Sequence, residues 1–161
     1  MFNIVLVEPE IPHNAGAAGR LAVATGSRLH LVAPLGFSLE EKQVRRAGLD
    51  YWKHVDLVVW ESWEDYRQAR LAEIEQGSPH RSWYLSTKGS KSHWQADFQE
   101  GDHLIFGAET RGLSDAIHQQ IPPSQLIRVP MAEGPIRSLN LSTSIGIVLY
   151  EASRQVAPDW R

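Results

Sequence analysis

The sequence of 161 residues contains no cysteine. A chain without cysteine forms no disulfide bond, no thiolate metal site and no cysteine nucleophile, and this composition agrees with the cytoplasmic location that we expect. No apolar run approaches the roughly 18 residues that a membrane helix needs. Residues 1–10 lack the basic region that opens a signal peptide. We therefore expect a protein that has no membrane partner.

An excess of positive charge is also missing. The formal net charge is −3, whereas proteins that bind nucleic acid usually carry a basic surface. If RNA binds this chain, it must contact local basic patches. The candidates are Lys42, Arg45 and Arg46, then Lys88 and Lys91, and finally Arg111, Arg128 and Arg137.

Several catalytic and cofactor motifs are absent. The sequence has no G-x-S-x-G elbow, no Walker A loop and no His-Glu-x-x-His helix. Residues 14–20 contain Gly16 and Gly19, but their spacing is not that of the dinucleotide-binding G-x-G-x-x-G loop. Serine hydrolases, P-loop proteins and dinucleotide-binding proteins therefore have no support, and we predict no metal site.

Short apolar runs alternate with segments of helical spacing along the whole chain. Strands are expected over residues 3–7, 29–33, 56–60, 82–86, 103–106 and 126–129, and helices over 14–25, 38–48, 62–76, 114–120 and 139–156. This alternation predicts an α/β fold in which helices flank a mostly parallel sheet. We interpret residues 1–161 as a single domain.

Three loops rich in glycine or proline each follow an expected strand, over residues 87–89, 107–113 and 130–140. In open α/β sheets, ligands bind outside the carboxyl ends of the strands, where such loops meet. The sequence therefore predicts a small ligand that is held largely by backbone groups of these loops.

Motifs around these loops carry a resemblance to a known superfamily. Residues 8–12 (EPEIP) with Asn14, Gly16 and Arg20 form the first motif, residues 106–113 (FGAETRGL) the second, and residues 127–131 (IRVPM) with 137–142 (RSLNLS) the third. Together they resemble the SPOUT-superfamily RNA 2′-O-methyltransferases. The order of the motifs and the chain length are similar to those of its small single-domain tRNA (cytidine/uridine) 2′-O-methyltransferases, which modify the wobble nucleotide.

The resemblance implies a deep trefoil knot in the C-terminal half, S-adenosylmethionine as methyl donor, and a homodimer with a composite active site on the tRNA anticodon stem-loop. The donor-binding positions that it implies are Leu85, Gly107, Val129 and Ser138. From the same loops we add Thr87, Glu109, Gly112 and Asn140 as candidates for donor binding. For Glu109, contact with a donor hydroxyl competes with a role in ordering its own loop. For Ser138 and Asn140, ligand contact competes with capping of the last helix.

Catalysis would rest on Arg20 and Asn14. An arginine hardly deprotonates in proteins, so we expect Arg20 to orient a phosphate and polarise the ribose hydroxyl rather than act as a base. Asn14 would support catalysis, cap the first helix, or do both.

For RNA contact we assign Lys42, Arg45, Arg46 and Arg137, although the first three could equally form a solvated helix face. Two alternatives stay open. The target could be another tRNA or rRNA nucleotide, or the chain could be a non-catalytic RNA-binding factor that retains the fold.

Overall fold

The computed structural model describes residues 1–40 and 50–157. Its strands are β1 Asn3–Val7, β2 Arg28–Val32, β3 Leu57–Trp60, β4 Ser82–Leu85, β5 Lys91–Ser92, β6 His103–Phe106 and β7 Leu126–Arg128. Its helices are α1 Pro12–Thr25, α3 Trp63–Glu75, α4 Asp115–His118 and α5 Leu141–Val156, with short 3-10 turns at η1 Trp52–His54, η2 His93–Gln95 and η3 Pro123–Gln125. Lys42, Arg45 and Arg46 lie outside the described residues. Of the helix expected over 38–48, residues 38–40 are described and are not helical, and the rest lies outside the described residues.

The strands form one seven-stranded sheet in the order β3-β2-β1-β6-β4-β7-β5, and each pair of neighbouring strands is parallel. The predicted α/β class with a parallel sheet is therefore confirmed. Strand β5 was not predicted, because two residues are too few to show a period. In the described part of the chain, no helix is long and apolar enough to cross a membrane.

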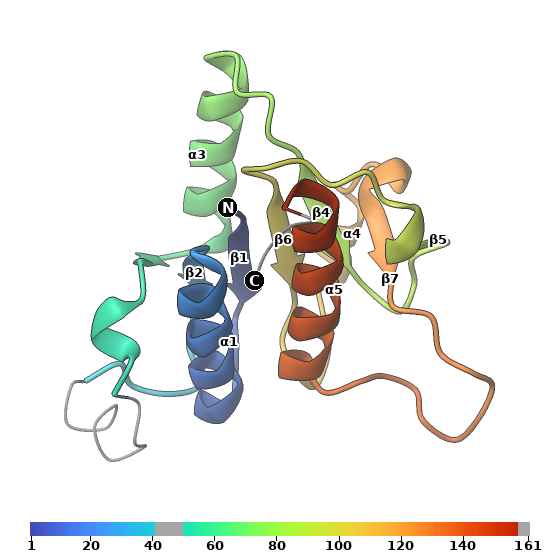
Figure 1. Cartoon of the computed structure of the whole chain (residues 1–161), viewed down its shortest axis with the longest axis horizontal. Helices are drawn as coiled ribbons and strands as arrows, with labels where there is room; N and C mark the ends of the chain where they lie inside the picture. Colours follow the sequence, from blue (N-terminus) through green and yellow to red (C-terminus); the bar gives the residue numbers. More distant parts are fainter. Residues whose placement is uncertain (41–49, 158–161) are drawn as a thin grey trace.

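Helices cover both faces of the sheet (Figure 1). Along β1, Ile4 and Leu6 pack in one apolar cluster with α1 and α5, whereas Val5 and Val7 pack in a second cluster with α3 and α4. Successive side chains of a strand point to opposite faces, so this alternation assigns α1 and α5 to one layer and α3 and α4 to the other. The continuous apolar runs reflect a sheet that is buried on both faces.

The boundaries of α1 follow from local chemistry. The helix begins at Pro12, not at Asn14 as expected, because proline is well suited to the first helical position, where its missing N–H would have had no partner. Ile11 occupies the N-cap position without a side-chain cap, so the prediction that Asn14 caps this helix is wrong. At the other end, Gly26 adopts the left-handed conformation (φ 62°) and ends the helix as predicted.

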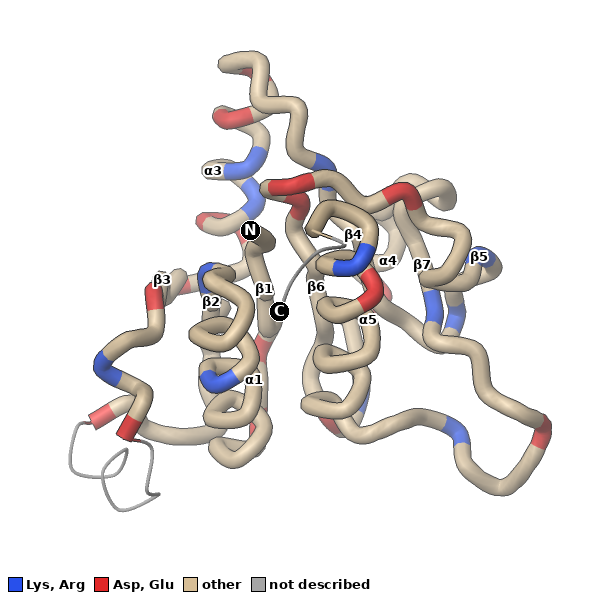
Figure 2. Tube along the Cα trace, viewed as in Figure 1, with Lys and Arg blue, Asp and Glu red and all other residues tan. Residues whose placement is uncertain are grey.

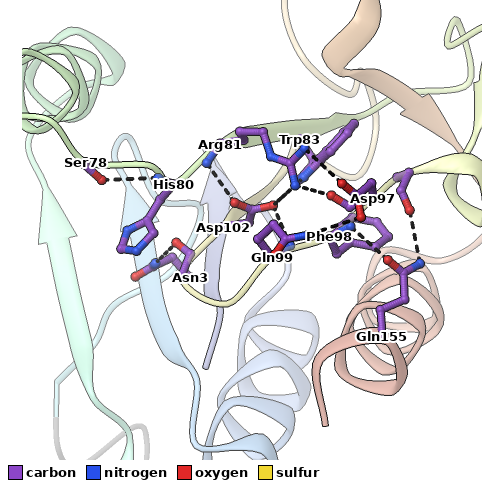
Figure 3. Close-up of polar contacts among 12 residues, drawn as sticks. Asn3, Ser78, His80, Arg81, Trp83, Asp97, Phe98, Gln99, Asp102 and Gln155 are labelled. Atoms are coloured by element: carbon purple, nitrogen blue, oxygen red, sulfur yellow. Dashed lines mark hydrogen bonds and ion pairs between the residues drawn. The ribbon is translucent and has the colours of Figure 1, made fainter. Parts of the chain in front are cut away.

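A buried polar network holds the amino ends of the central strands (Figure 3). The Asp102 side chain is fully buried and accepts hydrogen bonds from Arg81 N (2.8 Å), Trp83 Nε1 (2.8 Å) and Gln99 N (3.0 Å). These donors precede or begin β4 and β6, so the network ties two parallel strands together at the end of the sheet opposite the loops.

Two buried histidines lie under α3. The Trp60 indole donates to His30 Nδ1 (3.1 Å), and the Tyr66 hydroxyl is 2.9 Å from His103 Nδ1. Burial lowers the pKa of His30 to about 4 and the pKa of His103 to about 2. Both rings are therefore neutral near pH 7 and serve in packing.

The strand order has one unusual consequence. Strand β7 lies between β4 and β5, although both of those strands precede it in the chain. The carboxyl ends of β6, β4 and β7 are thereby adjacent, which brings the three predicted ligand loops together. The trefoil knot itself stays a prediction from the resemblance.

Candidate active site

A cavity of about 300 Å³ lies at the carboxyl ends of β6, β4 and β7, at the lower end of the range for small-molecule sites. All three predicted loops contribute to its wall. Of the predicted donor-binding positions, those that line it are Leu85, Thr87, Gly107, Glu109, Gly112, Val129 and Ser138. Asn140 is not among the lining residues in the described part of the chain, whereas Arg137, which we assigned to RNA contact, is.

The loop after β6 requires glycine at two positions. A Cβ atom added to Gly107 would lie 2.1 Å from the carbonyl carbon of Gly112, so the loop could not close on itself. Gly112 has a φ of 68°, a conformation that other residues rarely adopt. With the Gly112 N–H donating to the carbonyl of Ala108 (2.8 Å), the loop forms a tight turn that exposes backbone to the cavity.

The Glu109 carboxylate connects this loop to the first motif. It accepts hydrogen bonds from Glu10 N (2.7 Å), Ile11 N (3.0 Å) and Asn14 Nδ2 (3.1 Å). Burial alone would raise the pKa of Glu109, but hydrogen bonds from Glu10, Asn14 and other donors outweigh it and lower the pKa. Of the two roles expected for Glu109, the geometry supplies the ordering one.

Carboxylates of the first motif also contact the loop. The Glu10 carboxylate accepts from Thr110 N (3.0 Å) and Thr110 Oγ1 (2.8 Å), and Glu8 forms an ion pair with Arg111. Glu8 itself has a positive φ of 53°, a strained conformation for a residue with a side chain. Carboxylates of the first motif thus bind donors of the loop, and the Glu109 carboxylate of the loop binds donors of the first motif.

Asn14 extends this contact to the third motif. Its side chain is 2% exposed, and its Oδ1 accepts from Asn140 Nδ2 at 3.2 Å. Asn140 caps α5 as expected, because its Oδ1 accepts from Ser142 N at 2.9 Å. A hydrogen-bonded chain from Glu109 through Asn14 to Asn140 therefore joins all three sequence motifs.

Arg20 lies apart from this chain of contacts. It is exposed on α1, and its Cζ is 4.7 Å from the centre of the Tyr51 ring. The Tyr51 hydroxyl donates to the carbonyl of Gly16 at 2.6 Å, which anchors the ring on the same helix. Within the described residues, Arg20 does not line the cavity.

The cavity wall also contains a pair that sequence reasoning missed, Ser86 and His118. His118 Nδ1 is 3.0 Å from the carbonyl of Ser114, so this nitrogen carries the proton and Nε2 accepts from the Ser86 hydroxyl at 3.0 Å. Ser86 Oγ in turn accepts from Lys88 N (3.2 Å). No spacing in the sequence could indicate this pair, because 32 positions separate its members.

The sheet and its cavity define an α/β protein of the class that binds a small ligand where parallel strands end. A family model described as the SpoU rRNA Methylase family matches residues 1–150. The chain belongs to this family.

Individual relatives agree over nearly the full length. The chain is 50% identical over 155 residues to a tRNA (cytidine(34)-2′-O)-methyltransferase of Methylovorus glucosotrophus, which covers 96% of each chain. It is similar (TM-score 0.84, 44% identity, 96% and 95% of the two chains) to a solved structure that concerns the 2-OH methylation of C/U34 on tRNA. It is also similar (TM-score 0.83, 26% identity) to the SpoU methyltransferase AviRb of Streptomyces viridochromogenes in complex with AdoMet, with 99% of this chain and 58% of that one covered.

Proposed function

We propose that this protein transfers a methyl group from S-adenosylmethionine to the ribose 2′-hydroxyl of nucleotide 34, the wobble nucleotide, of tRNA. The observation that carries the proposal is that the second and third motifs line one cavity, and that the first motif is joined to both by the hydrogen bonds of Asn14 with Glu109 and Asn140. The names of the full-length relatives support the same reaction and the same nucleotide. A tRNA substrate also supports a cytoplasmic location.

The cavity suits S-adenosylmethionine by its chemistry. Its wall combines apolar side chains, including Leu85, Val129 and Leu139, with the hydroxyls of Thr87 and Ser138 and the exposed backbone of the glycine turn. An adenine ring suits the apolar part, and the ribose and amino-acid ends suit the polar groups. When bound, S-adenosylmethionine supplies a methyl group on a positively charged sulfur.

The residues of the chain then act mainly by position. A ribose hydroxyl is a poor nucleophile, so rate comes from holding it in line and stabilising the charge that develops on its oxygen. We assign both effects to the Arg20 guanidinium, which orients the nucleotide's phosphate and polarises the ribose hydroxyl. Asn14 keeps the start of α1 in place against Glu109 and Asn140.

Because Arg20 does not line the cavity of its own chain among the described residues, we propose that it serves the cavity of a partner in a homodimer. The anticodon stem would contact Arg137 at the cavity mouth. Lys42, Arg45 and Arg46 are proposed for the same role from the sequence alone.

The test combines calorimetry with mapping of the product. The protein is titrated with S-adenosylmethionine, then incubated with it and unmodified tRNA, and ribose methylation is located by mass spectrometry. We expect donor binding and methylation at nucleotide 34, both abolished in Ser138→Leu, which fills the third loop. A protein that binds the donor but methylates another nucleotide would refute the assigned target. A protein that binds RNA but no donor would support the non-catalytic alternative.

A further inference from the structure

Most cations of the described residues are neutralised by a neighbouring carboxylate. Those that form an ion pair are Arg28, Arg67, Arg70, Arg81, Lys88, Arg111 and Arg154. Five described cations form no ion pair with a described residue. Two of them, Arg20 and Lys53, belong to α1 and η1. The other three are Lys91, Arg128 and Arg137. They lie in β5, at the end of β7 and in the loop after β7, and Figure 2 shows basic residues along this side of the sheet.

The register explains how these cations flank the edge. Ser92 is opposite Arg128 and Lys91 is opposite Ile127 in the β5–β7 pair. Because side chains alternate along paired strands, Lys91 and Arg128 extend from opposite faces of the last two strands. Strand β5 ends the sheet. The half-buried Lys91 turns back over one face, with its Nζ 5.3 Å from the centre of the Trp83 ring on β4, whereas Arg128 is exposed on the other face. Arg137, which lines the cavity, continues this charge to the site.

An exposed aromatic ring accompanies the cations. Trp94 follows β5 in the η2 turn and is 67% exposed. The turn beneath it is held by a capping box, in which Ser92 Oγ accepts from Trp94 N (3.2 Å) and Gln95 Oε1 accepts from Ser92 N (3.0 Å). The indole is therefore presented to solvent on a fixed backbone, with the buried His93 ring 5.3 Å away.

We propose that an RNA-binding edge is formed by Lys91, Arg128, Arg137 and Trp94. This edge binds parts of the tRNA substrate other than the nucleotide that is methylated. The cations contact phosphates, which position a nucleic acid without reading its sequence. Trp94 stacks on an unpaired base, the usual way in which proteins hold single-stranded RNA loops. The inference rests on the proposed function, since it names further contacts for the same substrate.

The cation contacts are tested by the salt dependence of tRNA binding. In Lys91→Ala/Arg128→Ala, the log–log slope of affinity against salt should fall by roughly 1 to 2. A matched control is Arg28→Ala/Arg67→Ala, which removes the same charge from one exposed and one partly exposed residue that are paired with Asp56 and Glu64. The control should keep the wild-type slope, and both variants should bind S-adenosylmethionine as the wild type does.

The stacking contact is tested with two variants of Trp94. Trp94→Ala should weaken tRNA binding at least about fivefold, whereas Trp94→Phe, which keeps a ring, should restore most of it. Wild-type affinity and slope in all edge variants would overturn this inference and leave the proposed function standing, provided that the wild type binds and methylates tRNA. A wild-type protein that binds no tRNA would overturn both.

Discussion

Replacing Glu109 by glutamine tests the connection between the motifs with minimal change of shape. The carboxylate accepts three hydrogen bonds, and glutamine offers only one oxygen. If that oxygen faces Ile11 and Asn14, the amide group meets the N–H of Glu10, and two donors then oppose each other. Glu109→Gln therefore loses one charge-assisted bond and weakens two others.

Hydrogen bonds to charged groups contribute about 1.5–3 kcal/mol each, and neutral ones about 1 kcal/mol. Because water reaches part of the Glu109 side chain and compensates, we expect a net loss of about 2–3 kcal/mol. For a chain of this size that lowers the unfolding midpoint by roughly 4–12 °C. Thermal unfolding followed by circular dichroism at pH 7 measures it. Glu75→Gln, which neutralises an exposed carboxylate on α3, should change stability by no more than about 0.5 kcal/mol.

The pH dependence separates charge from shape. The folded pKa of Glu109 is lowered, so its charge stabilises the fold above the unfolded pKa, and this contribution disappears as pH falls through the folded pKa. The deficit of Glu109→Gln should therefore be full at pH 7 and shrink in acid. Equal midpoints at pH 7, or a deficit that is unchanged in acid, would refute the reasoning.

Three further results are expected. Arg20→Ala and Ser138→Leu should each be inactive alone but regain roughly a quarter of wild-type activity when refolded together. Half of the dimers are then mixed, and each mixed dimer rebuilds one of its two shared sites. Background activity in confirmed mixed dimers would exclude a shared site. His118→Leu should raise KM for S-adenosylmethionine with kcat at saturation unchanged. His118→Gln, which keeps an acceptor for Ser86, should restore the wild-type KM. A wild-type KM in His118→Leu would exclude the pair from the donor site. Burial lowers the pKa of His30 to about 4, so its neutral form stabilises the fold above about pH 6.5, and this contribution is lost as pH falls toward 4. Over that range the unfolding free energy of His30→Gln should decline less than that of the wild type. A parallel decline in the two proteins would contradict the assignment.

Much of this architecture is readable from periodicity. The apolar runs predicted six strands close to their observed positions, because a sheet buried on both faces leaves little ambiguity about where strands lie. Loops that follow those strands then had to meet at one end of the sheet. The glycines of the second loop marked a tight turn in the sequence, and the structure shows why: Gly107 has no room for a side chain and Gly112 has a positive φ.

The unpredicted features depend on contacts between distant segments. The role of Asn14 could not be separated from helix capping until its partners Glu109 and Asn140 were in view, because each lies about 100 residues or more away along the chain. Pro12 started α1 earlier than the apolar spacing suggested. The Ser86–His118 pair arises only from the packing of α4 beside β4, which no local pattern encodes.

The position of β7 also bears on how the chain is synthesised and folded. Strands β1, β2 and β3 pair with their sequence neighbours, so that half of the sheet can form while the rest is still on the ribosome. Among the described strands, by contrast, β5 pairs only with β7, which is synthesised some 35 residues later. The strands that carry the ligand cavity can therefore be completed only after β7 has been synthesised. A nascent chain that ends before β7 leaves the outer edge of β4 without its partner strand, and unpaired strand edges are prone to pair with other chains.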